Sequence, residues 1–204
     1  MITRMKYKVG NLMNKTKLGR DLLDFYVYRI KRSRNFVLKM MPKNAVCAEV
    51  GVSFGYFSES ILRVTCPKML CLIDLWELGE PASNRPHTEG NSDIAYETVL
   101  KRNNKRKNVK IYRGSSDKIL SSFPDEYFDW LYIDGDHRYE GVKSDLKLAV
   151  QKVKMGGFIA GDDYVETENF GVIQAAQEII KENNIKAICL EKNQFKLKKE
   201  IKES

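Results

Sequence analysis

Residues 45–58, AVCAEVGVSFGYFS, decide the fold of this chain of 204 residues. A short apolar run leads into Glu49, and two glycines follow, Gly51 and Gly55. From Phe57 onward, apolar residues recur at the spacing of a helix. The pattern predicts a buried strand, a glycine turn and the start of a helix, which together form the first half of a βαβ unit.

The glycine turn is predicted to bind a ligand. At Gly51 and Gly55 the backbone can approach a ligand where a Cβ atom would collide, and we count Ser53 between them among the ligand-binding residues. The first N–H groups of the following helix offer further donors. The spacing Glu-x-Gly-x-x-x-Gly differs from the Gly-x-Gly-x-x-Gly of dinucleotide sites. Because the carboxylate of Glu49 opposes a pyrophosphate, the turn favours a nucleoside that carries a positive charge. A purely structural turn is the alternative.

The rest of the chain alternates between strand-like and helical patterns. Further strands are expected at residues 69–73, 109–113, 128–133, 158–160, 185–190 and 194–197, and helices at residues 94–103, 139–152 and 172–183. Near-continuous apolar strands that alternate with helices predict an α/β fold with a mostly parallel sheet covered on both faces. The short turn at residues 191–193 predicts that the last two strands form an antiparallel hairpin at one edge.

The composition is that of an ordinary globular chain, with 43% hydrophobic and 30% charged residues. It contains no run of 18 apolar residues and no pattern of a secretory signal. The four cysteines are scattered and form no Cys-x-x-Cys pair. A reduced, cytoplasmic setting is the simplest interpretation.

The net charge of +8 is unevenly distributed. Residues 1–44 carry twelve Lys or Arg and two Asp, whereas residues 45–204 are slightly acidic. We therefore predict a basic helical extension at 1–44 and the main domain at 45–204. The extension is expected to pack on the domain with its charges solvated. The alternatives are contact with RNA, peripheral binding to an anionic membrane surface, or a homodimer contact.

Polar residues stand where the predicted strands end. These residues are Glu49, Asp74, Ser115, Asp134, Asp136 and Asp162. Ligands of open α/β sheets bind outside the carboxyl ends of the strands, so this registry predicts one crevice lined by these side chains. The long polar loop at 75–93 is expected to cover it, and His87 in that loop is expected to be an ordinary exposed histidine.

Five segments, in this order and spacing, resemble class I S-adenosylmethionine-dependent methyltransferases: AEVGVSFGYFS, CLIDLW, YRGSSDKIL, WLYIDGDHRYEGVKSDL and MGGFIAGDDY. The likeness covers roughly residues 45–190 and is strongest to small-molecule and sugar O-methyltransferases whose fourth strand ends in Asp-Gly-Asp and whose fifth ends in Gly-Asp-Asp-Tyr. It implies a Rossmann-like, seven-stranded sheet with a reversed last strand, and S-adenosylmethionine as the cofactor.

The resemblance also implies the cofactor-binding residues, which are Glu49, Gly51, Ser53, Gly55, Asp74, Ser115, Ser116 and Asp134. Asp74 would hold the ribose, because an acid at the tip of the second strand can accept hydrogen bonds from a diol. The alternative is a solvated aspartate that caps the next turn. Ser115 or Ser116 would approach the adenine, or serve the turn alone.

A divalent cation is implied as well. Related O-methyltransferases hold it with the first acid after the fourth strand and the acid pair after the fifth, which here are Asp134, Asp162 and Asp163. Three carboxylates favour Mg²⁺ or a similar hard ion. Such an ion lowers the pKa of an acceptor hydroxyl and fixes its direction. The alternative is a site without metal, in which Asp163 only caps the next segment.

The catalytic base is expected at Asp136 or His137. The resemblance favours Asp136, whereas the ordinary pKa of histidine suits the task better at neutral pH.

The acceptor is expected to be a hydroxyl of a sugar, glycan or similar polar small molecule. DNA is not expected, because the fourth strand is not followed by an Asn-Pro-Pro-Tyr-like segment. The alternatives are methylation of RNA gripped by residues 1–44, a nucleotide-binding reductase of Rossmann type, and a non-catalytic binding protein that kept the fold.

Overall fold

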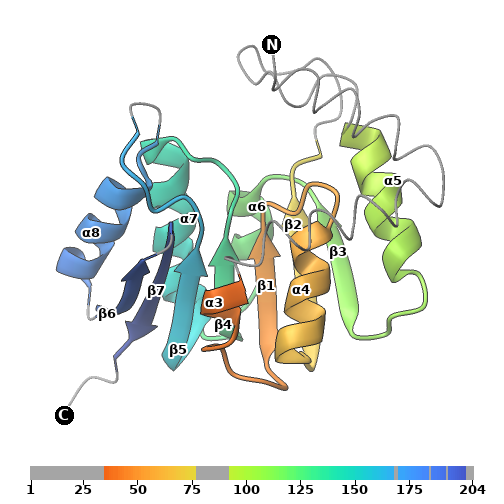
Figure 1. Ribbon diagram of the computed structural model, residues 1–204, viewed down its shortest axis with the longest axis horizontal. Coiled ribbons are helices and arrows are strands. Elements are labelled where there is room, and N and C mark those ends of the chain that lie inside the picture. The colour runs from red at the N-terminus through yellow and green to blue at the C-terminus, as the bar shows by residue number, and fades with distance from the viewer. Residues whose placement is uncertain (1–34, 77–91, 168–169, 184, 192, 201–204) are drawn as a thin grey trace.

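The computed structural model describes residues 35–76, 92–167, 170–183, 185–191 and 193–200. Within these residues the chain forms one seven-stranded sheet in the order β3-β2-β1-β4-β5-β7-β6 (Figure 1). Its strands are β1 (Val46–Val50), β2 (Met69–Asp74), β3 (Val109–Arg113), β4 (Phe128–Ile133), β5 (Val153–Gly161), β6 (Ile185–Glu191) and β7 (Gln194–Lys199). The first five strands are parallel, and β7 runs antiparallel to both β5 and β6. The predicted fold class, the reversed last strand and the edge hairpin are confirmed.

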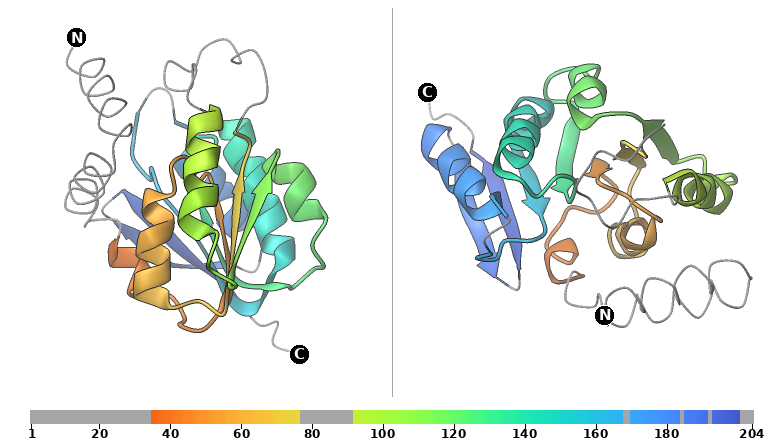
Figure 2. Two further views of the ribbon diagram at one scale, coloured as in Figure 1. Left: turned by 90° about the vertical axis from the view of Figure 1, so that its right-hand side faces the viewer. Right: turned by 90° about the horizontal axis from the view of Figure 1, so that it is seen from above.

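Helices cover both faces of the sheet (Figure 2). The described helices are α3 (Asn35–Leu38), α4 (Tyr56–Thr65), α5 (Ser92–Asn103), α6 (Ser116–Ser121), α7 (Tyr139–Lys152) and α8 (Val172–Glu182). One hydrophobic cluster joins the sheet to α6, α7 and α8, and a second joins the opposite face to α3, α4 and α5. Both faces of β1, β2 and β4 are therefore buried, which explains their continuous apolar runs.

Two elements differ from the sequence prediction. The strand β5 begins at Val153 rather than at residue 158, because Val153 already pairs with Phe128 before the register shifts. Gly156 in this part of the strand has φ 76, a value that glycine adopts without strain. The short helix α6 was not predicted, because its six residues are too few to display a helical period.

The end of the predicted basic extension joins the core. Val37, Leu38 and Met41 are buried in the cluster on the α4 face of the sheet. The buried Lys196 of β7 donates a hydrogen bond from Nζ to the carbonyl of Met40, at 2.6 Å. The remaining predicted helices of residues 1–34 lie outside the described residues, so the division at residue 44 stays a prediction.

The described residues hold no helix with the length and apolarity needed to cross a membrane. All four cysteines are free thiols. Burial raises the pKa of the Cys71 thiol to about 11, in keeping with the role of a small hydrophobic residue predicted for the strand cysteines.

Candidate functional site

The glycine turn lies directly against the loop that follows β4. Gly51 has φ 88, and a Cβ atom on it would lie 2.1 Å from the carbonyl oxygen of Asp134. The N–H of Asp134 in turn donates to the carbonyl of Val50, at 2.7 Å. From the sequence, glycine at position 51 was predicted to allow the close approach of a ligand. In the structure the close neighbour is the backbone of Asp134 and Gly135. The turn and Asp134 therefore form one continuous wall.

Asp74 holds the glycine turn in shape. Its Oδ2 accepts hydrogen bonds from the N–H groups of Val52 and Ser53, both at 2.7 Å, and its Oδ1 accepts from the N–H of Trp76, at 2.9 Å. Ser53 has φ 53, and its carbonyl accepts a hydrogen bond from Trp76 Nε1, at 2.9 Å. Asp74 lies at the tip of β2 as predicted, and two of these three hydrogen bonds run to the glycine turn.

Glu49 is buried beneath the turn. Its side chain is 0% exposed, and Ser58 of α4 donates a hydrogen bond to its Oε2. Gly55 precedes α4 with φ 75 at the N-cap position. Through its hydrogen bond with Ser58, Glu49 links β1 to the first turn of α4, a structural role that was not predicted from the sequence.

The two serines after β3 contact acids of the protein. Ser115 is the N-cap residue of α6, and its hydrogen bond lowers the pKa of Asp117. Ser116 donates from Oγ to Oδ1 of Asp145 on α7, at 2.5 Å. Asp145 is only 3% exposed, and burial raises its pKa to about 6, while the bond from Ser116 works against that rise. The second carboxylate oxygen of Asp145 faces the backbone at Gly135, 3.6 Å from the position of an added Cβ.

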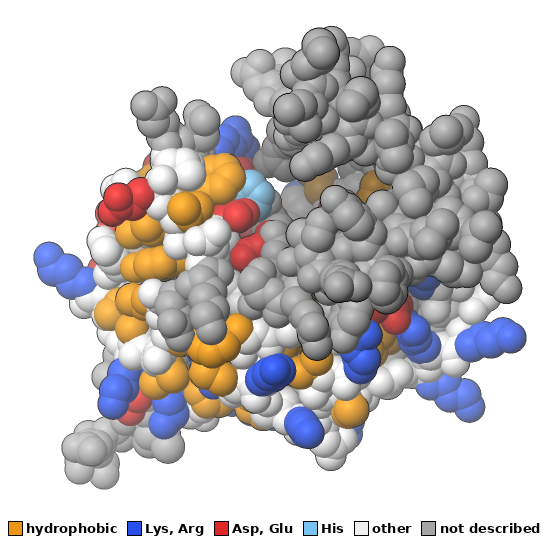
Figure 3. Space-filling model, viewed as in Figure 1, with side chains coloured by type: hydrophobic (Ala, Val, Ile, Leu, Met, Phe, Trp, Pro, Cys, Tyr) orange, Lys and Arg blue, Asp and Glu red, His pale blue; other side chains and the backbone are white. Residues whose placement is uncertain are grey.

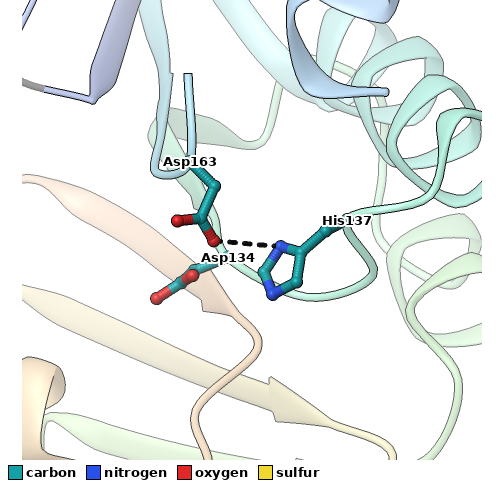
Figure 4. Close-up of side chains that lie close together, drawn as sticks. All are labelled: Asp134, His137 and Asp163. Atoms are coloured by element: carbon teal, nitrogen blue, oxygen red, sulfur yellow. Dashed lines mark ion pairs between the residues drawn. The ribbon is translucent and has the colours of Figure 1, made fainter. Parts of the chain in front are cut away.

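Asp134, His137 and Asp163 lie together where β4 and β5 end (Figure 4). Each offers one ligand atom, and the three atoms lie within 4.8 Å of one another. His137 Nδ1 is 3.2 Å from Asp163 Oδ2, and these side chains are 37% and 24% exposed. The group combines two carboxylates and an imidazole at a solvent-accessible edge, which suits a cation or a proton transfer.

The other two predicted acids do not belong to this group. Asp162 is buried, and its N–H continues the sheet by donating to the carbonyl of Ile133. Asp163 follows with φ 57, and only this second acid of the pair reaches the group. The carboxylate of Asp136 is held by the guanidinium of Arg138, through Nε at 3.0 Å and 3.1 Å and through a terminal nitrogen at 2.6 Å.

A hollow of about 470 Å³ lies between the segment after β5 and the start of α8. It is lined by Val165, Glu166, Thr167, Phe170, Ile173, Gln174 and Gln177. The ring of Phe170 lies 4.9 Å from the imidazole of His137, and the N–H of Gly171 donates to the carbonyl of His137, at 2.8 Å. In Figure 3 the His side chain lies beside acidic side chains, with hydrophobic side chains bordering them on the side of α8.

Four residues of this region were not predicted from the sequence: Trp76, Arg138, Asp145 and Phe170. For Asp145 a signal exists, because it lies on the buried face of α7 beside Val142, Leu146 and Ala149. An acid on the apolar stripe of a helix needs a partner. No comparable signal exists in the sequence for Trp76, Arg138 or Phe170. His87 lies outside the described residues.

Comparison with known proteins identifies the family of this chain. Residues 48–164 match the family model described as "Methyltransferase domain". A segment of 46 residues is 46% identical to an uncharacterized protein of Acanthamoeba polyphaga mimivirus and covers 20% of that protein.

Solved structures share the fold. An O-methyltransferase family protein from Burkholderia thailandensis superposes with a TM-score of 0.57 at 10% identity, over 94% of this chain and 62% of that one. The N-methyltransferase NodS from Bradyrhizobium japonicum, in complex with S-adenosylhomocysteine, gives 0.58 at 13% identity, over 95% of this chain and 97% of that one. The chain thus spans less than two thirds of the Burkholderia protein.

Proposed function

Since this chain belongs to the family of S-adenosylmethionine-dependent methyltransferases, we propose that it methylates a hydroxyl of a sugar or similar polar small molecule, with the help of a divalent cation. Family membership excludes the alternative of a Rossmann-type reductase. The proposal adds to it the acceptor, the cation and the residues with which the chain performs the transfer.

The donor is proposed to bind over the glycine turn. Gly51 and Gly55 shape this turn, and Asp74 fixes its N–H groups at residues 52 and 53. A carboxylate has more acceptor positions than the three N–H groups use, so Asp74 can still accept a hydrogen bond from a ribose hydroxyl. The negative charge of Glu49 behind the turn favours a cationic sulfonium donor.

One observation carries the proposal: the acid and histidine group shares a wall with the donor turn. Asp134 belongs to this group and also packs its backbone against Gly51. An acceptor hydroxyl held by Asp134, His137 or Asp163 would therefore stand close to a donor bound over the turn. Holding two reactants at contact distance removes much of the entropic barrier to their reaction.

The three side chains fit a cation. Asp134, His137 and Asp163 each offer one ligand atom, and the three atoms lie within 4.8 Å of one another, a spacing that a divalent ion between them can accept. When bound, such a cation lowers the pKa of an acceptor hydroxyl. The imidazole departs from the three carboxylates predicted from sequence, and a nitrogen ligand favours a first-row transition ion such as Mn²⁺ or Fe²⁺ over Mg²⁺.

The same group offers a route without a cation. With Asp163 at Nδ1 of His137, the Nε2 nitrogen is left to accept the proton of the hydroxyl. Asp136 suits this task less well, because Arg138 binds its carboxylate at both oxygens. His137 is thus a ligand in one route and the base in the other.

A hydroxyl acceptor is favoured over an amine by this group. A neutral amine is nucleophilic without activation, whereas a hydroxyl needs its proton removed or its pKa lowered. RNA methylation through residues 1–44 remains the second candidate, and its motivation is the basic charge of that segment.

The test is a methyl-transfer screen on hydroxylated and amine acceptors, with labelled S-adenosylmethionine and the full chain. We expect transfer to a hydroxyl, loss of activity in EDTA, and better recovery with Mn²⁺ than with Mg²⁺. Activity that resists EDTA would remove the cation and leave His137 as the base. Transfer only to amines, or salt-sensitive transfer to RNA that disappears on deletion of residues 1–34, would overturn the proposal.

A further inference from the structure

We propose that the hollow between the segment after β5 and the start of α8 binds an uncharged sugar ring of the acceptor, with Phe170 as its stacking platform. This inference rests on the proposed function, because it assigns the hollow to the acceptor. It goes further by naming the chemical class that the hollow accepts and the residues that select it.

The lining combines an aromatic ring with short polar groups. Phe170 is half-buried, and Val165 and Ile173 border it with apolar surface. One face of a pyranose carries several C–H groups and packs on such a ring, because the aromatic face is electron-rich. The edge of the same sugar carries hydroxyls, which are both donors and acceptors.

The polar lining suits those hydroxyls. Gln174 and Gln177 are exposed side chains one turn apart on α8, and each amide can donate and accept. Glu166 adds a carboxylate that accepts from two neighbouring hydroxyls. A hollow of about 470 Å³ falls within the range of small-ligand sites and has room for one or two sugar rings.

The charge of the hollow excludes phosphorylated acceptors. Its described lining contains no Lys or Arg and one acid, Glu166. A phosphate monoester placed here would meet the carboxylate of Glu166 and no described cation of the lining, which opposes its binding. The same argument disfavours an RNA backbone in this hollow.

The position of Phe170 connects the hollow to the chemistry. Its ring lies 4.9 Å from the imidazole of His137, and the next residue, Gly171, is bonded to the carbonyl of His137. A sugar stacked on Phe170 therefore presents its rim to the group formed by Asp134, His137 and Asp163. Phe170 is a specificity-determining residue in this account.

The test measures binding separately from methyl transfer. The full chain, loaded with S-adenosylhomocysteine, is mixed with the methyl glycosides of glucose, galactose, mannose and rhamnose, and with hexose phosphate monoesters. Binding is followed by saturation-transfer NMR and titration. The variants are F170A, the conservative F170Y, and I188A, which removes an exposed isoleucine of β6 outside the hollow.

We expect at least one neutral glycoside to bind, with an affinity about tenfold lower in F170A and close to that of the wild type in F170Y and I188A. Phosphate monoesters should not bind. The inference is overturned if no neutral glycoside binds, if the phosphates bind as well, or if F170A retains full affinity. Phe170-dependent binding without methyl transfer would leave this inference standing and contradict the proposed function instead.

Discussion

The two parts of the proposed site are built differently. The proposed donor side, which comprises Glu49, the turn from Gly51 to Gly55, and Asp74, is held by internal hydrogen bonds. Asp74 accepts from three backbone N–H groups, and Glu49 is fully buried. The acceptor side, which comprises Asp134, His137, Asp163 and Phe170, is partly exposed and borders a hollow.

Under the proposed function, this difference separates the part that binds the methyl donor from the part that selects the acceptor. On the donor side, the turn is held by hydrogen bonds to Asp74, a residue at the end of β2. The acceptor side consists of side chains from segments that follow two strands, so exchanging a few of them changes the substrate without disturbing the sheet. The predictions below test this division.

The largest effect is expected for G51A on the donor side. A Cβ atom at Gly51 would overlap the carbonyl of Asp134, so we expect a loss of about 3 kcal/mol or more in the free energy of unfolding and no detectable binding of S-adenosylhomocysteine. The matched control is G156A, because Gly156 also has positive φ but nothing within 4 Å of an added Cβ. It should cost about 1 kcal/mol. If G51A and G156A lowered the free energy of unfolding equally in urea denaturation, the close packing of Gly51 against Asp134 would be refuted.

The second effect is a pH dependence of stability that arises from Asp145. This residue accepts a hydrogen bond from Ser116 after β3 and faces Gly135 after β4. Its pKa is raised from 3.8 to about 6 by burial, so the folded protein binds this proton more tightly than the unfolded chain. The resulting stabilisation is complete below about pH 4 and is lost as the pH rises through 6, a change of about 3 kcal/mol.

The variant D145N has no such titration, and its amide oxygen can still accept the bond from Ser116. Denaturation curves between about pH 4 and pH 7 should show D145N gaining on the wild type as the pH rises. A constant difference between the two proteins would show that Asp145 does not titrate in this range.

A third, smaller effect is expected for D74A. Three backbone N–H groups lose their acceptor, so the turn should loosen and the affinity for S-adenosylhomocysteine should fall by about thirtyfold in calorimetry. D74N, which keeps one acceptor oxygen, should lie between D74A and the wild type. Unchanged affinity in D74A would mean that the turn keeps its shape without Asp74.

The smallest effect is expected at Asp136 and Arg138. Because the side chain of Arg138 is 76% exposed, their pair contributes little, and kcat of R138A and D136N should fall by no more than about threefold. If Asp136 were the base, D136N would instead lower kcat by about a hundredfold or more. The kcat values of R138A and D136N thus show whether Asp136 only positions the loop after β4 or acts as the catalytic base.

The sequence predicted the donor side better than the acceptor side. The spacing from Glu49 to Gly55 is local, and local spacing fixes the strand, the turn and the helix that follow. The reason for Gly51 was not predictable, because its neighbour Asp134 comes from a distant strand. Strand ends brought Asp134 and Asp163 to one edge, as expected for parallel strands.

The acceptor side depends on the directions of single side chains. Asp162 follows β5 and is buried, with its N–H bonded to Ile133, whereas Asp163 has φ 57 and reaches the group; no sequence pattern distinguishes the two. In the same way, Arg138 binds Asp136, and His137 is the residue that reaches Asp163. These choices follow from backbone angles and local partners that a single sequence does not reveal.

The most direct test of the central claim is the rate of methyl transfer by H137A, measured with the best hydroxyl acceptor together with the affinity for S-adenosylhomocysteine. The control is E140Q, which alters an exposed acid at the start of α7. We predict that H137A lowers kcat by about a hundredfold or more while the affinity for S-adenosylhomocysteine changes by less than about twofold, and that E140Q behaves as the wild type. A kcat of H137A close to that of the wild type would contradict the account.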